Sequence, residues 1–279
     1  MQKTELNIEG SKGKPILVDI SYNNDGNLKP IILFCHGFKG FKDWGHFNLI
    51  AKEFAENNFV FVKFSFSHNG TTAEHPIDFV DLDTFGKNNF SLELEDTERI
   101  LDFIVKNAPA FEGNPNHITL IGHSRGGGIS ILKAANDCRI HKLVTWASIK
   151  DINDFFKNSA IDIWKSRGIE YTYNARTKQN MPLFYQLYED YSKNKEQLNI
   201  LKAAKAISIP WLIIHGTSDS SVKVECANKL HQCNQKSKLI LIQDADHTFG
   251  GKHPWDSKEL PDFTKILTKE TIQFINTNN

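Results

Sequence analysis

Two hydrophobic patterns divide the chain near Pro30. Before it, the segments 4–8 and 16–22 alternate apolar with polar residues and are separated by two glycines and a proline. This alternation is typical of a half-exposed β-hairpin. After it, short continuous apolar runs recur at 31–35, 60–66, 118–121, 143–147, 211–214 and 239–242. Such runs indicate parallel strands that are buried on both faces.

Helical stretches lie between these runs. The stretch 93–105 repeats apolar residues on one face and begins with acidic residues, which favour the positive end of a helix. A last helix is predicted at about 262–275. Because strands and helices alternate, the pattern predicts an α/β fold with a mostly parallel, doubly wound sheet and an N-terminal antiparallel hairpin.

One interval breaks this alternation, since about 60 residues separate the run at 143–147 from the run at 211–214. It contains a helix-like segment, then strand-like alternation around a turn, then a second helix-like segment; these lie at 147–158, 169–187 and 193–207. We interpret residues 149–209 as a small cap inserted into a core formed by 1–148 and 210–279. The cap is too small to bury much core of its own, so it is not expected to be a second domain.

The composition narrows the possible classes of protein. The chain has 279 residues, of which 40% are hydrophobic, 11% aromatic and 24% charged, values that are ordinary for a globular protein. Its 33 basic and 33 acidic residues leave no net charge to attract nucleic acid or an anionic membrane. We see neither a signal peptide nor an apolar stretch of about 18 residues. We therefore expect a soluble, cytoplasmic monomer or homodimer whose four cysteines are free thiols.

The strongest chemical signal is the segment ITLIGHSRGGG at 118–128, where an apolar strand leads into a Gly-x-Ser-x-Gly motif and then a helix-like stretch. This is the context of a nucleophile elbow. The serine of such an elbow lies on a strained turn, and the flanking positions need glycine because larger side chains would clash. Gly122 and Gly126 meet that requirement, so Ser124 is the predicted nucleophile.

A second apolar strand, 31–35, ends in His36 and Gly37. An acyl-transfer enzyme needs two backbone N–H donors for the developing oxyanion, one after the nucleophile and one from the loop after this strand. Arg125 and Phe38 hold those two positions. His36 precedes the loop that approaches the substrate, so we interpret it as a buried structural residue.

The acid and the base are predicted from the ends of two later strands. Asp219 follows the run 211–214, where a carboxylate can hold an imidazole in the required tautomer. His247 follows the run 239–242 within five residues and fits a general base. The order serine, acid, histidine is the order found with this type of elbow.

Three other aspartates compete for the role of the acid. Asp244 and Asp246 lie three and one residues before His247, and Asp151 lies after the strand predicted at 143–147. The first two lie on the same turn as the histidine and are poorly placed to accept a hydrogen bond from its ring. We therefore favour Asp219, with Asp151 as the serious rival.

Several side chains near these segments are candidates for substrate contact. Aromatic side chains commonly line apolar pockets, although aromatic residues of a cap also form its own small core. The candidates are Trp44, His68, Trp164, Tyr171, Tyr173 and Tyr185. No cluster has metal-ligand spacing, and neither a phosphate-binding nor a dinucleotide-binding glycine loop occurs, so no metal or cofactor is implied.

With these motifs in this order, the chain resembles the α/β-hydrolase superfamily from about Pro30 to its C-terminus. The compact cap, the HGFKG loop and the GHSRGG elbow resemble small bacterial carboxylesterases of the cinnamoyl (feruloyl) esterase kind. They also resemble serine peptidases of the prolyl oligopeptidase and aminopeptidase kind. The chemical residues that the resemblance implies are Ser124, His247, Asp219, Phe38 and Arg125.

The sequence therefore predicts a serine carboxylic-ester hydrolase that acts on a small-molecule ester through an acyl-enzyme and favours aromatic or medium-length esters. A serine peptidase or amidase with the same triad is the first alternative. It would need a site for the charged end of a peptide, and no acidic cluster in the cap clearly offers one. A non-catalytic small-molecule receptor on the same fold is the second, and an intact triad argues against it.

Overall fold

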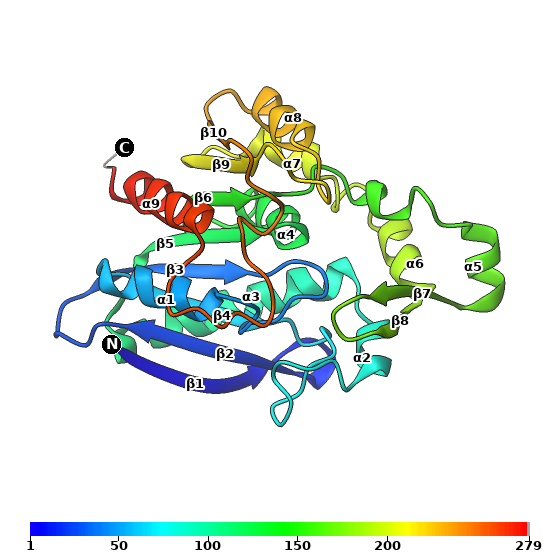
Figure 1. The fold of residues 1–279 in the computed structure, drawn as a ribbon, viewed down its shortest axis with the longest axis horizontal. Helices are drawn as coiled ribbons and strands as arrows, with labels where there is room; N and C mark the ends of the chain where they lie inside the picture. Colours follow the sequence, from blue (N-terminus) through cyan, green and yellow to red (C-terminus); the bar gives the residue numbers. More distant parts are fainter. Residues whose placement is uncertain (278–279) are drawn as a thin grey trace.

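The computed structural model describes residues 1–277 (Figure 1). The strands of its central sheet are β1 (Gln2–Glu9), β2 (Pro15–Tyr22), β3 (Lys29–Cys35), β4 (Val60–Ser65), β5 (Gly113–His123), β6 (Ile140–Trp146), β9 (Trp211–Gly216) and β10 (Lys238–Ile242). They lie in the order β1-β2-β4-β3-β5-β6-β9-β10. β2 is antiparallel to both β1 and β4, and every other neighbouring pair is parallel. The predicted hairpin and the mostly parallel sheet are thus confirmed.

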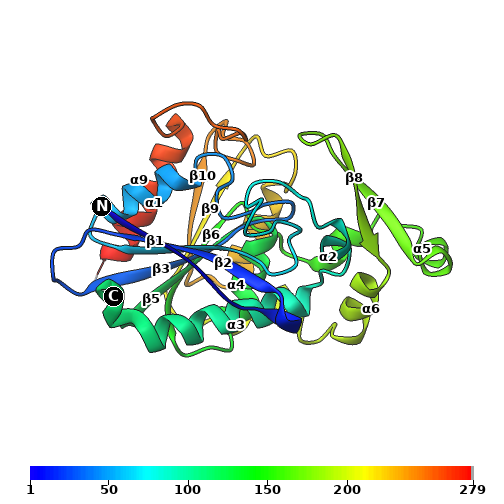
Figure 2. The same ribbon diagram turned by 90° about the horizontal axis from the view of Figure 1, so that it is seen from below.

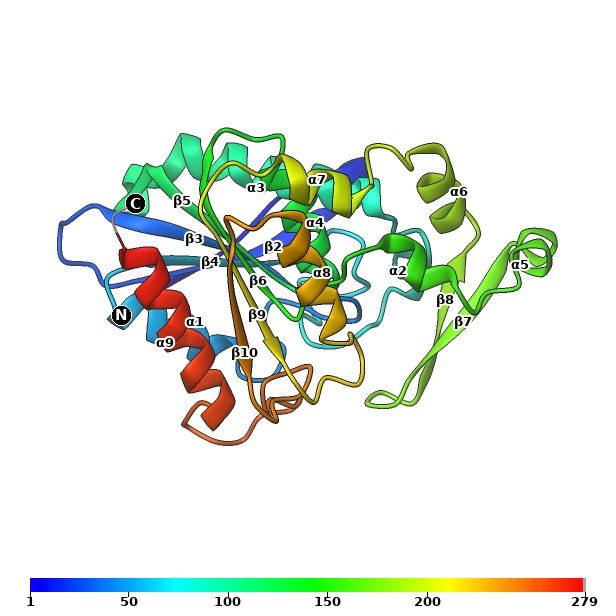
Figure 3. The ribbon, with the colours of Figure 1, turned by 90° about the horizontal axis from the view of Figure 1, so that it is seen from above.

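Helices cover both faces of this sheet (Figures 2 and 3). One face carries α1 (Phe47–Glu56) and α9 (Asp262–Asn276), and the other carries α3 (Phe90–Asn107), α4 (Arg125–Ala134), α7 (Ile200–Ala206) and α8 (Glu225–Cys233). The neighbours Ile31 and Ile32 on β3 are both fully buried and belong to the two opposite hydrophobic cores. Because successive side chains of a strand point to opposite faces, a strand between two helix layers reads as a continuous apolar run.

The segment between β6 and β9 projects beyond one end of the sheet, at the right of Figure 1. Its elements are the 3-10 helix η3 (Ile152–Phe156), α5 (Ile161–Arg167), β7 (Ile169–Asn174), β8 (Gln179–Phe184) and α6 (Gln186–Lys193). β7 and β8 form an antiparallel hairpin of their own. The last helix of the interval, α7, instead packs against α4 and α8 of the core.

The helix predicted at 147–158 is wrong, because this part of the chain contains only the short helix η3. Ala147 has a φ of +49°, so the backbone turns sharply where β6 ends. The Asp151 carboxylate then accepts a hydrogen bond from the N–H of Asn153, which closes a local turn instead of opening an α-helix.

The remaining short elements are η1 (Ser11–Gly13), α2 (Leu82–Gly86) and η2 (Ala108–Phe111). Over residues 1–277, no helix has the length and apolar character that crossing a bilayer requires. All four cysteines are free thiols, as predicted.

Candidate active site

The turn between β5 and α4 carries Ser124 in a constrained conformation. Its φ of +57° lies in the left-handed region that side chains rarely adopt. A Cβ on Gly122 would lie 2.3 Å from the carbonyl oxygen of Gly126, and a Cβ on Gly126 would lie 2.4 Å from that of Cys35. Both positions therefore require glycine, because α4 begins in direct contact with the ends of β5 and β3.

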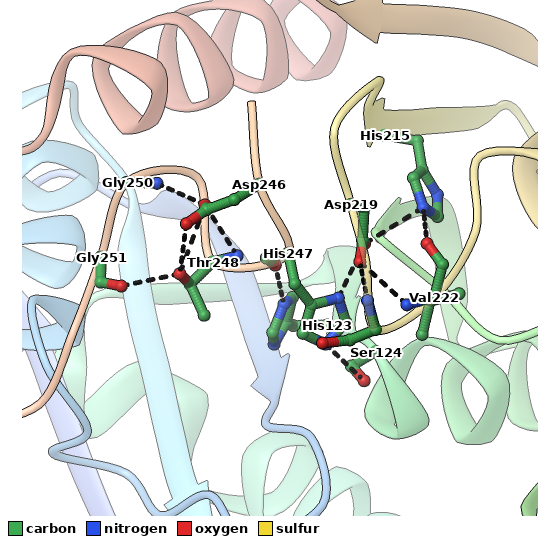
Figure 4. Close-up of polar contacts among 11 residues, drawn as sticks. His123, Ser124, His215, Asp219, Val222, Asp246, His247, Thr248, Gly250 and Gly251 are labelled. Atoms are coloured by element: carbon green, nitrogen blue, oxygen red, sulfur yellow. Dashed lines mark hydrogen bonds and ion pairs between the residues drawn. The ribbon is translucent and has the colours of Figure 1, made fainter. Parts of the chain in front are cut away.

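Ser124, His247 and Asp219 form a connected chain of contacts (Figure 4). The Nε2 atom of His247 lies 3.0 Å from Ser124 Oγ, and its Nδ1 atom lies 2.7 Å from Asp219 Oδ2. The three residues follow β5, β10 and β9, whose carboxyl ends meet at one edge of the parallel sheet. The structure thus brings together the three residues that the sequence singles out from separate strands.

The Asp219 side chain is fully buried yet well supplied with donors. Its Oδ1 accepts the N–H groups of Ser221 and Val222, each at 2.8 Å. Burial by itself raises the pKa of Asp219, but hydrogen bonds from His215 and His247 outweigh it and lower the pKa below its ordinary value. The carboxylate therefore stays ionised beside the imidazole.

Two further histidines, neither of them predicted from the sequence, support this arrangement. His215, at the end of β9, is buried, and its Nε2 lies 2.7 Å from the carbonyl oxygen of Val222 and 3.2 Å from Asp219 Oδ2. His123, the residue before the serine, donates from Nε2 to the carbonyl oxygen of His247 at 2.8 Å. Burial lowers the pKa of His123 to about 3, so this ring is neutral and fixes the backbone of the base. The position of each at the end of an apolar strand is a signal that could have identified it.

The competing aspartates have other partners. Asp246 Oδ1 accepts the N–H groups of Thr248 and Gly250, which shapes the loop after His247. Asp244 is exposed and accepts from the side chain of its neighbour Gln243. Within residues 1–277, Asp219 supplies the one carboxylate that lies within 4.0 Å of a His247 ring nitrogen.

The loop after β3 approaches the serine closely. A Cβ on Gly37 would lie 2.9 Å from Ser124 Cβ, so the loop needs glycine there. His36 donates from Nδ1 to the Gly37 carbonyl at 2.8 Å, and its Nε2 accepts the N–H of Phe66 at 3.2 Å. Burial lowers the pKa of His36 to about 4, which keeps it neutral. The ring holds the loop in place, as a structural residue would.

Phe38 follows this glycine, and Arg125 follows the serine. Within the described residues, neither backbone N–H donates to a protein acceptor. Arg125 is the first residue of α4, whose N-terminal amides have no intrahelical partner. Both N–H groups are therefore available to an external oxygen atom.

Two cavities meet at Ser124 and His247. We call the first the Arg176 cavity; it has a volume of about 410 Å³, and its lining includes Phe38, Lys39, Trp44, Phe47, Asn174, Arg176, Lys252 and His253. We call the second the Phe155 cavity; it has a volume of about 680 Å³, and its lining includes Phe38, Phe90, Arg125, Ile149, Asp151, Phe155, Lys223 and Glu225. Ser124 and His247 line both, so the two cavities can receive the two sides of a scissile bond.

The structure divides the substrate-contact candidates. Trp44 lines the Arg176 cavity. His68 lies away from both cavities, where it is buried with its Nδ1 2.7 Å from Ser67 Oγ. Trp164 is fully buried and donates its indole N–H to the carbonyl oxygen of Leu183. It belongs to the core of the inserted segment and not to a cavity wall.

The three tyrosines also lie away from these cavities. Tyr171 and Tyr173 on β7 are 62% and 58% exposed, whereas Asn174 is buried and lines the Arg176 cavity. Because side chains alternate along a strand, the tyrosines face away from the side that Thr172 and Asn174 occupy. Tyr185 packs its ring against Trp164.

A parallel sheet with helices on both faces and a serine on the turn after a central strand defines an α/β-hydrolase. The chain belongs to the BD-FAE family, whose model matches residues 18–233.

Curated relatives match a large part of the chain. It is 25% identical over 245 residues to the isoprenylcysteine alpha-carbonyl methylesterase ICME of Arabidopsis thaliana, a match that covers 81% of this chain and 52% of the relative. It is 28% identical over 164 residues to the uncharacterized protein YfhR of Salmonella typhimurium, which covers 57% of this chain and 50% of that protein. The chain thus spans about half the length of these relatives.

Solved structures share the fold at low sequence identity. DcsB, in complex with its substrate analogue, superposes with a TM-score of 0.74 at 15% identity and covers 100% of both chains. Est1E from Butyrivibrio proteoclasticus gives 0.67 at 15% identity over 97% of each chain. The esterase domain of a Rhodothermus marinus protein gives 0.64 at 17% identity and covers 99% of this chain and 100% of that domain. The predicted α/β-hydrolase fold is confirmed.

Proposed function

We propose that the chain is a serine carboxylic-ester hydrolase that acts through an acyl-enzyme. The observation that carries the proposal is the position of His247, which bridges Ser124 Oγ at 3.0 Å and Asp219 Oδ2 at 2.7 Å. Membership of the BD-FAE family supports it, as do curated relatives that are named methylesterases and esterases. The substrate class we propose is a small-molecule ester.

Acylation of the serine would be the first half of the reaction. Ser124 Oγ attacks the ester carbonyl carbon while its proton passes to His247 Nε2. Asp219 accepts the Nδ1–H of the imidazole, which fixes the tautomer and stabilises the imidazolium. The backbone N–H groups of Phe38 and Arg125 donate to the oxyanion. The tetrahedral intermediate then expels the alcohol, which takes the proton from Nε2, and the acyl group remains on Ser124.

Deacylation would repeat these steps with water as the nucleophile. His247 takes a proton from the water as the oxygen attacks the acyl carbon, and the same two N–H groups stabilise the second oxyanion. Collapse of this intermediate breaks the bond to Ser124 Oγ, which regains its proton from Nε2. The carboxylic acid leaves and the free enzyme is restored.

The Phe155 cavity supports a preference for aromatic or medium-length esters. Phe38 and Phe90 come from the core, and Ile149 and Phe155 come from the inserted segment. Because these apolar side chains all line the cavity beside Ser124, we propose that the inserted segment acts as a cap that completes a substrate pocket. A wall of this kind favours acyl or alcohol groups larger than acetate.

The test combines active-site labelling with a substrate panel. A fluorophosphonate probe should label wild type and the exposed control variant Ser192→Ala, but not Ser124→Ala. The Ser124→Ala protein should fold normally and lose at least ~10³ in kcat on esters, since little catalysis remains without the nucleophile. Faster hydrolysis of aminoacyl-arylamides than of esters would instead indicate a peptidase. Ligand binding without any turnover would indicate a receptor, and either result would overturn the proposal.

A further inference from the structure

All the charged side chains that line the Arg176 cavity are cationic. Lys39, Arg176 and Lys252 contribute to its wall, and no aspartate or glutamate does. Lys39 comes from the loop after β3, and Arg176 comes from the turn between β7 and β8. Ser124 lines the same cavity, so positive charge lies close to the proposed nucleophile.

Arg176 makes no protein contact that would use its guanidinium donors. Among residues 1–277, it has no ion pair within 4.0 Å and no side-chain hydrogen bond, and its Nη2 atom is buried without an acceptor. The guanidinium carbon lies 5.5 Å from the ring centroids of both Phe41 and Phe79, which hold the charge in place. A buried donor without an acceptor is unfavourable, and a guanidinium matches the geometry of a carboxylate.

Lys39 connects strand β7 to the loop after β3. Its Nζ donates to the carbonyl oxygen of Tyr173 at 3.1 Å and lies 3.5 Å from Thr172 Oγ1, and it too has no carboxylate partner among the described residues. His253 adds a neutral donor to the wall, because its Nδ1 accepts the N–H of Gly45 at 2.7 Å and the proton must then lie on Nε2. The cavity is thus rich in donors on several sides.

The Phe155 cavity differs in charge. It contains lysines together with Asp151, Asp154 and Glu225. Two of its lysines are already paired, since Lys150 and Lys157 lie 3.0 Å and 2.5 Å from oxygens of Asp154. Unlike the Arg176 cavity, it therefore places carboxylates beside its cationic side chains, which disfavours an anionic group, and its aromatic side chains suit an uncharged group.

We propose that the Arg176 cavity binds a carboxylate carried by the ester substrate, while the Phe155 cavity binds the uncharged part across the scissile bond. The carboxylate pairs with Arg176, and Lys39 adds to the positive potential. The substrate class is an ester that keeps one free carboxylate, either on its acyl group or on its alcohol. This inference rests on the proposed ester hydrolysis and specifies its substrate.

Matched pairs of esters test the inference. The acyl-side pair is the aryl monoester of a short dicarboxylic acid and the corresponding ester of its monoamide. The alcohol-side pair is the acetate ester of a hydroxybenzoate and that of the hydroxybenzamide. At low salt, in at least one pair, kcat/KM should be about tenfold or more higher for the carboxylate than for the carboxamide. Raising the salt concentration about tenfold should reduce that preference.

Variants in the turn between β7 and β8 test whether Arg176 causes the preference for carboxylate esters. Arg176→Gln should remove most of the preference, and Arg176→Lys should keep part of it because the charge remains. Lys178→Gln is the matched control, since it removes a positive charge from the same turn at an exposed residue outside the lining. It should leave the preference unchanged. If Arg176→Gln does not fold, two other measurements test the inference: the preference for the carboxylate ester in Arg176→Lys, which should be reduced, and the salt dependence of that preference in wild type.

The result that overturns the inference is equal kcat/KM within both pairs, or a preference that survives in folded Arg176→Gln. Either result leaves the proposed function intact as long as the carboxamide esters are hydrolysed and Ser124→Ala abolishes their hydrolysis. If no ester of either pair is hydrolysed, the proposed function fails, and with it this inference.

Discussion

Arg125 donates a hydrogen bond from Nε to Glu93 Oε2 at 2.9 Å, in an ion pair whose two side chains are each 5% exposed. The Arg125 guanidinium also lies 3.9 Å from the ring centroid of Phe90 and 5.5 Å from that of Phe38. The Arg125 side chain thus links helix α3 to Phe38. Arg125 and Phe38 are the two residues whose backbone N–H groups are the proposed oxyanion donors. We infer that this pair positions the start of α4 against the loop after β3.

Removing one partner of the buried ion pair between Glu93 and Arg125 should destabilise the folded protein. Glu93→Gln leaves the Arg125 charge without a counter-charge and should lower the free energy of unfolding by roughly 3 to 5 kcal/mol. Glu95→Gln on the same helix breaks an ion pair with the partly exposed Arg99 and should cost under about 1 kcal/mol. Urea unfolding measures both changes. The double variant Glu93→Leu/Arg125→Met should be more stable than Glu93→Gln, and a double variant that is less stable would contradict this account.

Asp219 should dominate the other aspartates in catalysis. Asp219→Asn cannot hold the imidazole in the same tautomer, so we expect kcat on a neutral ester to fall by about 10³ to 10⁴. Asp246→Asn and Asp244→Asn should cost less than about tenfold, because their contacts are with the loop and not with the His247 ring. Steady-state kinetics of the three variants at one pH make the comparison. A loss for Asp246→Asn as large as that for Asp219→Asn would count against the assignment.

Preference for bulky esters should depend on the Phe155 cavity and not on the exposed tyrosines. Phe155→Ala removes a ring from the cavity wall, so the ratio of kcat/KM for an aromatic ester to that for an acetate of the same leaving group should fall about tenfold. Tyr171→Ala, in the same inserted segment but 62% exposed, should leave the ratio unchanged. Equal turnover of acetates and bulky esters by wild type would show that the cap only excludes water.

Most of the sheet, and the proximity of Ser124, Asp219 and His247, could be predicted because the signals for both are local. A strand buried on both faces must be apolar at consecutive positions, as in the run 31–35, and an elbow needs glycine on both sides of Ser124. The acid and the base then follow from strand ends, because the carboxyl ends of parallel strands meet at one edge. The contact between Asp219 and His247 can therefore be predicted from the positions of the two residues along the chain.

The features that could not be predicted from the sequence depend on contacts between distant segments. Lys63 lies inside an apolar run, yet it is buried because its Nζ lies 2.5 Å from oxygens of both Asp19 and Asp43. The local sequence pattern does not predict these two partners. The position of Tyr171 and Tyr173 depends on which face of the hairpin turns toward the core, and a shift of one residue reverses that choice. Arg176 lies in a polar turn that has no distinguishing pattern.

Buried histidines should make stability depend on pH. Burial lowers the pKa of His36, His46 and His68 to about 4, and each is less than 5% exposed. In the unfolded chain a histidine has a pKa of about 6.5, so between about pH 6.5 and pH 4 the unfolded state binds more protons than the folded state. The free energy of unfolding should therefore fall as the pH falls through this window and should not change through these groups above it.

A single variant isolates one of these groups. In wild type, the unfolded state binds a proton at His36 that the folded state does not bind, and His36→Gln removes this difference. The slope of unfolding free energy against pH between about pH 6.5 and pH 5 should therefore become shallower, by up to the amount that one bound proton contributes. His75→Gln replaces an exposed histidine and is the matched control. Urea unfolding at several pH values gives the slopes for wild type and both variants. Equal slopes for wild type and His36→Gln would mean that His36 binds its proton over the same pH range in the folded and the unfolded protein. Its hydrogen bonds to the Gly37 carbonyl and from the Phe66 N–H argue against that, because they require a neutral ring.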